Sequence, residues 1–539
     1  MNAILRHGPG LAGVAILVAG LLAPAPAPAQ QQQPYQWILV QPPAANATDA
    51  ELERVRAQWG VQQADRVVVT PSGMEIWRAP RTVDTQSARG GYGKYEVLPA
   101  DPREIFLPVA EAGLAAAVKS NLERVRARGY AKRVEVVHMK SPRTTSLALR
   151  YADTVTWRLF DKVRIVGTRH ARFSRMQNMG RFAWVGGLDA KSRDCDAALF
   201  ANGFASLTFG NGHLYGRLEH GKDIYQIIPL GGGYHATVEV DPDKLPDQPD
   251  LANIEDEGGD MLDLPTIVDE GGDMLDRKGL AGRTAPTFTT CSVDIPRCDT
   301  GAKATRATIR IGVAFTREAM LDVHSGEKHF ADHLVNVTNA ALARSGVNSR
   351  FELAGTHVFD KVENAYPDSK ALLAALVTSP PPASVAPLQQ WRDNKGADVV
   401  VLITRAATYP GVGAVAGLSP PPGTLGNPAQ AWSIVPARFA DAQLSFQHEL
   451  GHVLGAGHNW QANTPASFTY GHGFRNQCQW RTIMSYEDRV ACANHGTPRY
   501  ALFSACNVVV NGNALAGGLL ENNARVLNEQ AQAVSKYRP

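Results

Sequence analysis

The stretch SFQHELGHVLGAGHNW, residues 445–460, contains three histidines, one glutamate and three glycines. No proline occurs between Pro436 and Pro465, and apolar residues recur at helical spacing around the stretch. These two features predict a helix through the first part of the stretch. We place the start of this helix near Asp441, because aspartate is an acceptable N-cap residue.

The spacing of the histidines in this stretch favours a metal site. His448 and His452 are four residues apart, so on a helix both imidazoles project from one face and can reach one ion. Glu449 lies about 100° further around the helix, beside the ion rather than on it. Gly455 can adopt a positive φ, which turns the chain so that His458 returns as a third ligand. Three protein ligands leave a fourth position for water, as in catalytic zinc sites, whereas structural zinc sites are closed by four ligands.

The alternative interpretation is a helix that happens to be rich in histidine. Five fixed identities at these spacings arise by chance in roughly one chain in ten thousand or fewer at normal residue frequencies. We therefore favour the metal site.

These residues also carry a resemblance to a known family. HELGHVLGAGH matches H-E-x-x-H-x-x-G-x-x-H, the signature of the metzincin zinc peptidases, at every fixed position. RTIMSYE resembles the methionine turn of that family, with Met484 lying 484 − 458 = 26 residues past the third histidine. Tyr486 falls where the astacin and serralysin branches carry a tyrosine near the metal. The surrounding sequence is most similar to a bacterial reprolysin-like group that includes peptidyl-Asp metallopeptidases, although Asn459 stands where reprolysins usually carry aspartate.

The resemblance implies a Zn²⁺ cofactor held by the three histidines. It implies that zinc lowers the pKa of its bound water to about 7 and that Glu449 acts as the general base. Met484 would form an apolar floor beneath the histidines, and Tyr486 would help to stabilise the oxyanion. The fold expected is an α/β (α+β) metzincin-like zinc peptidase domain, with a mixed sheet and an active-site helix.

The sequence of residues 306–539 agrees with this expectation. ATIRIGVAFT, RFELAGTHVF and GADVVVLIT are predicted strands, and HFADHLVNVTNAALARSG is a predicted helix ending at Gly346. GVGAVAGLS, residues 411–419, is a candidate edge strand on which an extended peptide could pair.

Residues 30–246 mix helical and strand patterns and predict a strand-rich α+β domain. SLTFGNGHLYGRLEH and YQIIPLGGGYHATVEV predict antiparallel hairpins with glycine turns. The second segment, extended to DPDKLP, is similar to propeptides of the reprolysin-like group. The resemblance implies a propeptide domain that acts as an intramolecular inhibitor. Residues 247–305 predict an acidic, glycine-rich linker in which DEGGDMLD occurs at 256–263 and again at 269–276.

The N-terminus predicts export. A short charged region and the apolar run LAGVAILVAGLLA precede small residues, which is typical of a signal peptide cleaved after Ala29. Residues 1–29 are therefore the predicted signal peptide, and no membrane partner is expected after cleavage. The formal charge of +3 without a basic block gives no indication of a nucleic-acid partner. Six cysteines in an exported chain allow three disulfides, among which Cys291–Cys298 and Cys478–Cys492 are candidate pairs.

Three further residue groups have a competing metal interpretation. His329 and His333 flank Asp332 in HFADH, which resembles an inverted zinc motif, but we interpret them as part of a solvated helix face. We interpret His472 as a turn or packing residue. Cys195 could in principle fill the open position of the zinc, although its surroundings match no known switch motif, and a disulfide or an idle thiol is favoured.

The sequence therefore predicts a secreted zinc-dependent metalloendopeptidase, made as a proenzyme and acting on protein or peptide substrates. One alternative is a secreted, non-catalytic binding protein that retains the fold with a structural zinc. Glu449 argues against it, because a structural site has no use for a base beside the metal. A zinc amidase acting on non-protein amides is another alternative, and the methionine turn disfavours it.

Overall fold

The computed structural model describes residues 35–41, 49–82, 94–98, 101, 103–139, 142–160, 163–170, 174–178, 181–190, 199–245, 307–405, 415–416, 428–460, 468–488, 491–493, 495–506, 508–510 and 514–538. The predicted signal peptide, the predicted linker, Cys195 and the candidate pair Cys291–Cys298 lie outside these residues. Those predictions stay predictions. Below, residues 35–245 are called the front module and residues 307–538 the rear domain.

A five-stranded mixed sheet, in the order β16-β15-β17-β19-β18, forms the centre of the rear domain. Its first four strands are parallel, and β18 runs antiparallel to β19 at the edge. The strands are β15 (Thr308–Thr316), β16 (Arg350–Phe359), β17 (Val399–Thr404), β18 (Val415–Ala416) and β19 (Trp432–Pro436). The three predicted strands are confirmed, and the candidate edge strand is confirmed over its two described residues.

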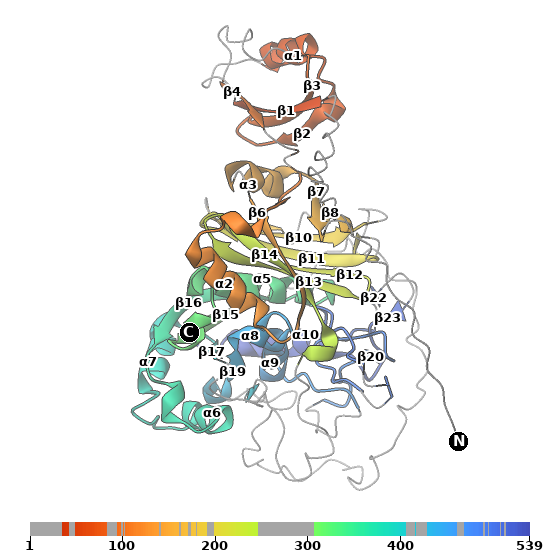
Figure 1. Ribbon diagram of the computed structural model, residues 1–539. Coiled ribbons are helices and arrows are strands. Elements are labelled where there is room, and N and C mark those ends of the chain that lie inside the picture. The colour runs from red at the N-terminus through yellow and green to blue at the C-terminus, as the bar shows by residue number, and fades with distance from the viewer. Residues whose placement is uncertain are drawn as a thin grey trace, which may run out of the picture.

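Helices cover both faces of this sheet (Figure 1). They are α5 (Glu327–Arg344), α6 (Ser369–Val377), α7 (Ala386–Lys395), α8 (Ala437–Ala440), α9 (Ser445–Val453) and α10 (Asn523–Val534). Alternate residues of β17 point to opposite faces. Val400 and Leu402 pack in the cluster with α6 and α7, whereas Val401 and Ile403 pack in the cluster with α5 and α9.

Two short hairpins complete the C-terminal part of the rear domain. They pair β20 (Arg475–Asn476) with β21 (Trp480–Arg481) and β22 (Val509–Val510) with β23 (Ala514–Leu515).

The front module contains a large antiparallel sheet of ten strands and a separate sheet of four strands (Figure 1). The large sheet contains β5 (Leu107–Pro108), β6 (Ala131–His138), β7 (Thr154–Leu159), β8 (Val163–Arg169), β9 (Arg175–Asn178), β10 (Arg181–Leu188), β11 (Gly203–Gly210), β12 (His213–His220), β13 (Asp223–Gly231) and β14 (Tyr234–Val240). The small sheet contains β1 (Tyr35–Gln41), β2 (Arg66–Val69), β3 (Glu75–Pro80) and β4 (Lys94–Leu98). The helices are α1 (Asp49–Gln58), α2 (Ala116–Arg126) and α3 (Pro142–Tyr151).

Both predicted hairpins of the front module are confirmed, as β11–β12 and β13–β14. Asn211 and Gly212 connect β11 to β12 with φ values of 53° and 77°. A two-residue turn with positive φ at both positions matches the right-handed twist of the flanking strands, which explains the Asn-Gly pair there.

The large front sheet packs against α5, which lies between it and the rear sheet (Figure 1). The prediction that His329, Asp332 and His333 lie on a solvated helix face is therefore wrong: their exposed fractions are 1%, 3% and 1%. The Nε2–H of His329 donates to the carbonyl of Thr208 at 3.0 Å, and the ring of Tyr215 stacks on His333. The helix is buried on this side because a second sheet covers it.

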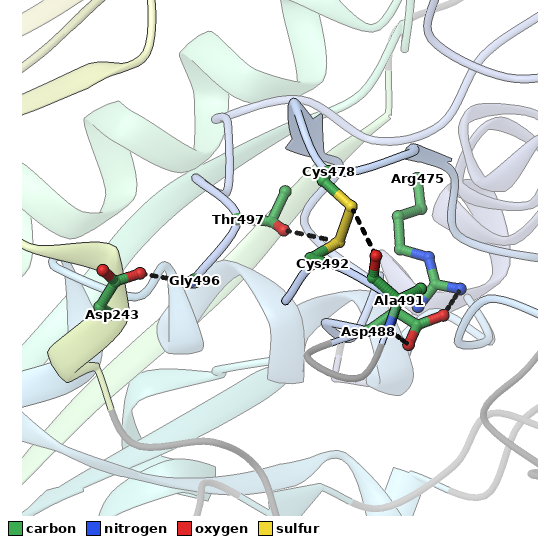
Figure 2. Close-up of a disulfide and its surroundings, with 8 residues drawn as sticks. All are labelled: Asp243, Arg475, Cys478, Asp488, Ala491, Cys492, Gly496 and Thr497. Atoms are coloured by element: carbon green, nitrogen blue, oxygen red, sulfur yellow. Dashed lines mark hydrogen bonds and ion pairs between the residues drawn. A yellow bond between two sulfur atoms is a disulfide. The ribbon is translucent and has the colours of Figure 1, made fainter. Parts of the chain in front are cut away.

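A disulfide between Cys478 and Cys492 confirms one of the two candidate pairs (Figure 2). The loop that it closes contains Met484 and Tyr486. Beside the disulfide, the carboxylate of Asp243 accepts a hydrogen bond from the backbone N–H of Gly496 (Figure 2). The end of the front module therefore contacts the segment that follows the loop closed by the Cys478–Cys492 disulfide. Within the described residues, no helix has both the length and the apolarity needed to cross a membrane.

Candidate metal centre

The helix α9 supplies the first two histidines of the predicted metal site, but it starts later than predicted. Its N-cap is Leu444, in the left-handed region at φ 59°, and not Asp441. Asp441 instead lies at the C-terminal end of α8, where its carboxylate accepts a hydrogen bond from Gln226 and lies 3.4 Å from the Nε2 of His333. Contacts with distant segments therefore override the capping preference of this aspartate.

Three imidazoles converge on one point. The Nε2 atom of His448 lies 3.1 Å from the Nε2 atoms of both His452 and His458. Two ligands about 2.0 Å from a tetrahedral zinc ion would be about 3.3 Å apart, so the observed spacing fits one ion. Within the described residues, these three histidines are the group whose ligand atoms lie close enough to hold a metal.

Hydrogen bonds to backbone carbonyls orient two of the rings. The Nδ1–H of His448 donates to the carbonyl of Ile483 at 2.9 Å, and the Nδ1–H of His452 donates to that of Ala456 at 2.9 Å. In the neutral tautomers so fixed, the Nε2 atoms carry lone pairs that face each other. Facing lone pairs repel unless a cation lies between them, so the donor set suits a metal ion.

Electrostatics keep the imidazoles neutral. Burial, followed by the neighbouring His452 and Arg499, holds the pKa values of His448 and His458 well below the ordinary range. Burial also lowers the pKa of His452 to about 4. Neutral imidazole is the form that ligates a metal, so the group is ready to bind at neutral pH.

The turn after α9 brings in the third histidine as predicted. Gly455 has φ 88°, and its N–H donates to the carbonyl of His452 at 2.8 Å, while the N–H of Ala456 donates to that of Gly451 at 2.9 Å. A side chain at position 455 would be strained by this φ and would lie 2.9 Å from the ring of Phe468. Glycine is thus required for the chain to reverse towards His458.

Glu449 follows His448 in α9 and is fully buried. Because successive helical residues are about 100° apart, its carboxylate projects from a face adjacent to that of the histidines. Glu449 is thus a buried carboxylate one residue from His448, and it is not part of the histidine group that could hold the metal.

Met484 packs directly against α9. A Cβ at Gly451, which lies between the two helical histidines, would be 2.4 Å from the Met484 Sδ and 3.2 Å from the ring of Phe503. The methionine is fully buried and provides an apolar contact with the helix.

Tyr486 lies next to the histidines. Its ring centroid is 4.1 Å from that of His458, and its ring is nearly parallel to that of His448 at 5.9 Å. Its backbone N–H donates to the Oδ1 of Asn459 at 2.8 Å. Asn459, the residue that departs from the reprolysin pattern, therefore links the segment that carries His458 to the methionine turn. His472 stacks on Trp460 and bonds the carbonyl of His458 through its Nδ1–H, which agrees with its interpretation as a packing residue.

Two arginines that the sequence did not indicate support this turn. Arg481 and Arg499, both 2% exposed, donate to the carbonyl of Ser485 at 2.7 and 3.3 Å. Arg481 also pairs with the buried Glu487, and Arg499 donates to the carbonyl of Gln443 at 3.0 Å. The charges of RTIMSYE could have suggested the pair Arg481–Glu487, whereas nothing in the sequence pattern marks Arg499.

The histidine group could hold one metal ion, and the match to a family model agrees with a metzincin-like metallopeptidase. Residues 305–499 match the model of metallo-peptidase family M12, in its Reprolysin_5 group. The chain therefore carries a metzincin-like metallopeptidase domain. A named relative is the peptidyl-Asp metalloendopeptidase of Xanthomonas campestris pv. campestris, 26% identical over 331 residues that cover 60% of this chain and 67% of the relative.

Solved structures with some similarity include one titled as a chaperone-substrate complex. It is 18% identical with a TM-score of 0.34, over 43% of this chain and 35% of that chain. Another is metalloproteinase-II from Bacteroides fragilis, 11% identical with a TM-score of 0.30, over 63% of this chain and 89% of that one.

Proposed function

We propose that this protein is a secreted, zinc-dependent metalloendopeptidase made as a proenzyme. The observation that carries the proposal is the convergence of the Nε2 atoms of His448, His452 and His458 in a domain of the metallopeptidase family. The three rings would hold Zn²⁺ as the cofactor. Zinc bound there would polarise a peptide carbonyl and acidify a water molecule.

The side chains around the histidines divide the remaining tasks. Glu449 takes a proton from the attacking water and delivers it to the amine nitrogen of the leaving peptide, so the proton is conserved through the reaction. Tyr486, whose ring packs beside those of His448 and His458, would support the oxyanion that develops on the carbonyl. Met484 holds the floor of the site through its contact with α9.

The edge of the rear sheet supports binding of an extended peptide. β18 is antiparallel to β19 and is the last strand of the sheet order. A peptide that adds to such an edge gains backbone hydrogen bonds irrespective of its sequence. The named relative is called a peptidyl-Asp endopeptidase, and we propose bonds next to aspartate as the substrate class for this chain.

Residues 30–246 are proposed to be a propeptide and an intramolecular inhibitor, with the signal peptide, the linker and the catalytic domain bounded as predicted from the sequence. The extensive packing of the large front sheet on α5 supports a role for the front module in the precursor. Export rests on the N-terminal sequence alone.

The proposal is tested by Glu449→Gln in the processed protein. The variant should bind zinc like the wild type but fail to hydrolyse an unfolded protein such as casein, and a chelator should abolish the wild-type activity. Mass spectrometry of the products gives the cleaved bonds. Hydrolysis by Glu449→Gln at the wild-type rate would show that the base is misassigned. A wild type that binds zinc but cleaves nothing would favour the non-catalytic zinc protein.

A further inference from the structure

A buried ion cluster joins the front module to the rear domain. Arg217 and Glu219, on β12, and Arg344, at the end of α5, are 0%, 2% and 8% exposed. The carboxylate of Glu219 accepts hydrogen bonds from the Arg217 Nε at 2.9 Å, from the Arg344 Nη1 at 2.8 Å and from the backbone N–H of Ala501 at 2.8 Å. Desolvation of three charges offsets much of their attraction, so stability alone is a weak reason for such a cluster.

The other N–H groups of the Arg217 guanidinium donate hydrogen bonds to backbone carbonyls of the rear domain. Its Nη1 donates to the carbonyl of Asp441 at 2.7 Å and lies 3.4 Å from that of Ala442. Its Nη2 donates to the carbonyl of Arg499 at 2.9 Å. One side chain of the front module thus bridges the connection between α8 and α9 and the segment that follows the methionine turn.

The side chain of Arg499 also links the connection between α8 and α9 to the methionine turn, and its acceptors lie nearer in sequence to the histidines and to Met484. It donates to the carbonyl of Gln443, just before α9, and to that of Ser485, between Met484 and Tyr486. The segments that it holds also orient His448. The carbonyl of Leu444 accepts from the His448 backbone N–H at 2.9 Å, and that of Ile483 accepts from its Nδ1–H.

We propose that Arg217 is a positioning residue for the metal centre. In the full chain, the front module uses this arginine to fix the two segments that orient His448, and the zinc affinity of the precursor therefore depends on a residue outside the peptidase domain. The inference rests on the proposed function only in taking zinc as the ion. Loss of groups that orient metal ligands typically weakens binding about 10- to 100-fold.

Arg344, in the same ion cluster, offers a matched control for substitution of Arg217. Arg344 pairs with the same carboxylate as Arg217 and is also buried, and its guanidinium lies over the ring of Phe204. Among the described contacts, Arg344 donates to none of the three carbonyls that Arg217 binds. Arg217→Met and Arg344→Met each remove one positive charge from beside Glu219, but only the first removes the bridge.

The experiment measures zinc affinity in the full chain by competition with a chromophoric chelator, together with thermal unfolding of each zinc-free variant. We expect Arg217→Met to weaken zinc binding by about 10-fold or more. Arg344→Met should stay within about 3-fold of the wild type while losing comparable stability, and Arg217→Lys, which can reach some of the carbonyls, should be intermediate. Should Arg217→Met not fold, Arg217→Lys and Arg344→Lys give the same comparison.

Equal zinc affinities for the Arg217 and Arg344 variants would overturn the inference. Failure of the proposed function has a different signature: a wild type that does not bind zinc, or a His452→Ala variant that binds it as tightly as the wild type. With zinc bound normally by the wild type and lost in His452→Ala, an unaffected Arg217→Met overturns the positioning role alone.

Discussion

The amide oxygen of Asn459 accepts a hydrogen bond from the backbone N–H of Tyr486 at 2.8 Å. Both residues are buried, at 4% and 8% exposure. The bond crosses from the residue after the third histidine to the residue whose ring packs on that histidine. The position at which the chain departs from the reprolysin pattern is therefore a structural link of the metal centre.

Asn459→Ala should remove this link and leave the N–H of Tyr486 buried without its acceptor. Such a loss typically costs about 1–3 kcal/mol. We expect a corresponding drop in the unfolding free energy and a lower zinc occupancy after dialysis. Asn459→Asp keeps an acceptor oxygen and should retain more zinc than Asn459→Ala. Equal zinc retention by the two variants would contradict the role of the acceptor.

Gly451→Ala should disturb the contact between α9 and Met484, because the added Cβ would be 2.4 Å from Sδ. Overpacking of a buried site costs about 1–3 kcal/mol, and we expect that loss in chemical unfolding, with weaker zinc binding. The matched background is Met484→Ala, in which the clashing atom is absent. In the Met484→Ala background, Gly451→Ala should lower the unfolding free energy by less than it does in the wild type. An equal loss in the wild type and in Met484→Ala would show that the added Cβ clashes with another group.

Acid should destabilise the front module through His235. Burial, followed by the nearby His213, lowers the pKa of His235 to about 3. Because the folded-state pKa lies below the ordinary value, the folded chain favours the neutral ring. The resulting stabilisation is complete above about pH 6.5 and is lost as the pH falls towards about 3.

The matching variant is His235→Asn, which cannot take up that proton. Between about pH 6 and pH 4, the stability difference between wild type and variant should change by about 1.4 kcal/mol per pH unit. Chemical unfolding at several pH values measures this slope, with the difference at pH 8 as the reference. A difference that does not vary with pH would mean that His235 is protonated equally in both states.

Removal of the Cys478–Cys492 disulfide should loosen the loop that carries Met484 and Tyr486. The bonded residues are 14 apart in sequence, and closing a loop of about that length stabilises the folded state by about 3 kcal/mol. Calorimetry of the double variant Cys478→Ser/Cys492→Ser should show that loss, and the variant should release zinc faster to a chelator. Substitution avoids a reductant, which would also act on other disulfides. An unchanged unfolding temperature would show that the loop is held by its other contacts, such as those of Arg481.

The parts of the metal centre that the sequence predicted depend on local geometry. The four-residue spacing of His448 and His452 and the positive φ of Gly455 are local properties, and the structure has both. The strands β15, β16 and β17 were predictable for the same reason, since β17, for example, is a continuous apolar run that is buried along its whole length. The strand β19 was not predicted from the sequence.

The wrong or missing predictions concern residues whose positions depend on contacts between segments distant in the sequence. Asp441 has the chemistry of an N-cap, but its carboxylate is bound by Gln226, 215 residues away, and α9 starts later. His329 and His333 resemble a solvated pair because no local pattern shows that a sheet from the front module covers α5. The contacts of Arg217 and Arg499 were not predicted, because their acceptors are backbone carbonyls, which have no signature in a sequence.

One apolar cluster includes Val238 and Ile228 of the front module and Phe330 and Leu334 of α5. During synthesis the ribosome delivers the front sheet before α5, so a docking surface already exists when that helix emerges. A gene fragment encoding only the rear domain would produce α5 with nothing to cover this side, and its product should collect in inclusion bodies. Recombinant preparation of the peptidase should therefore begin from both halves translated as one polypeptide.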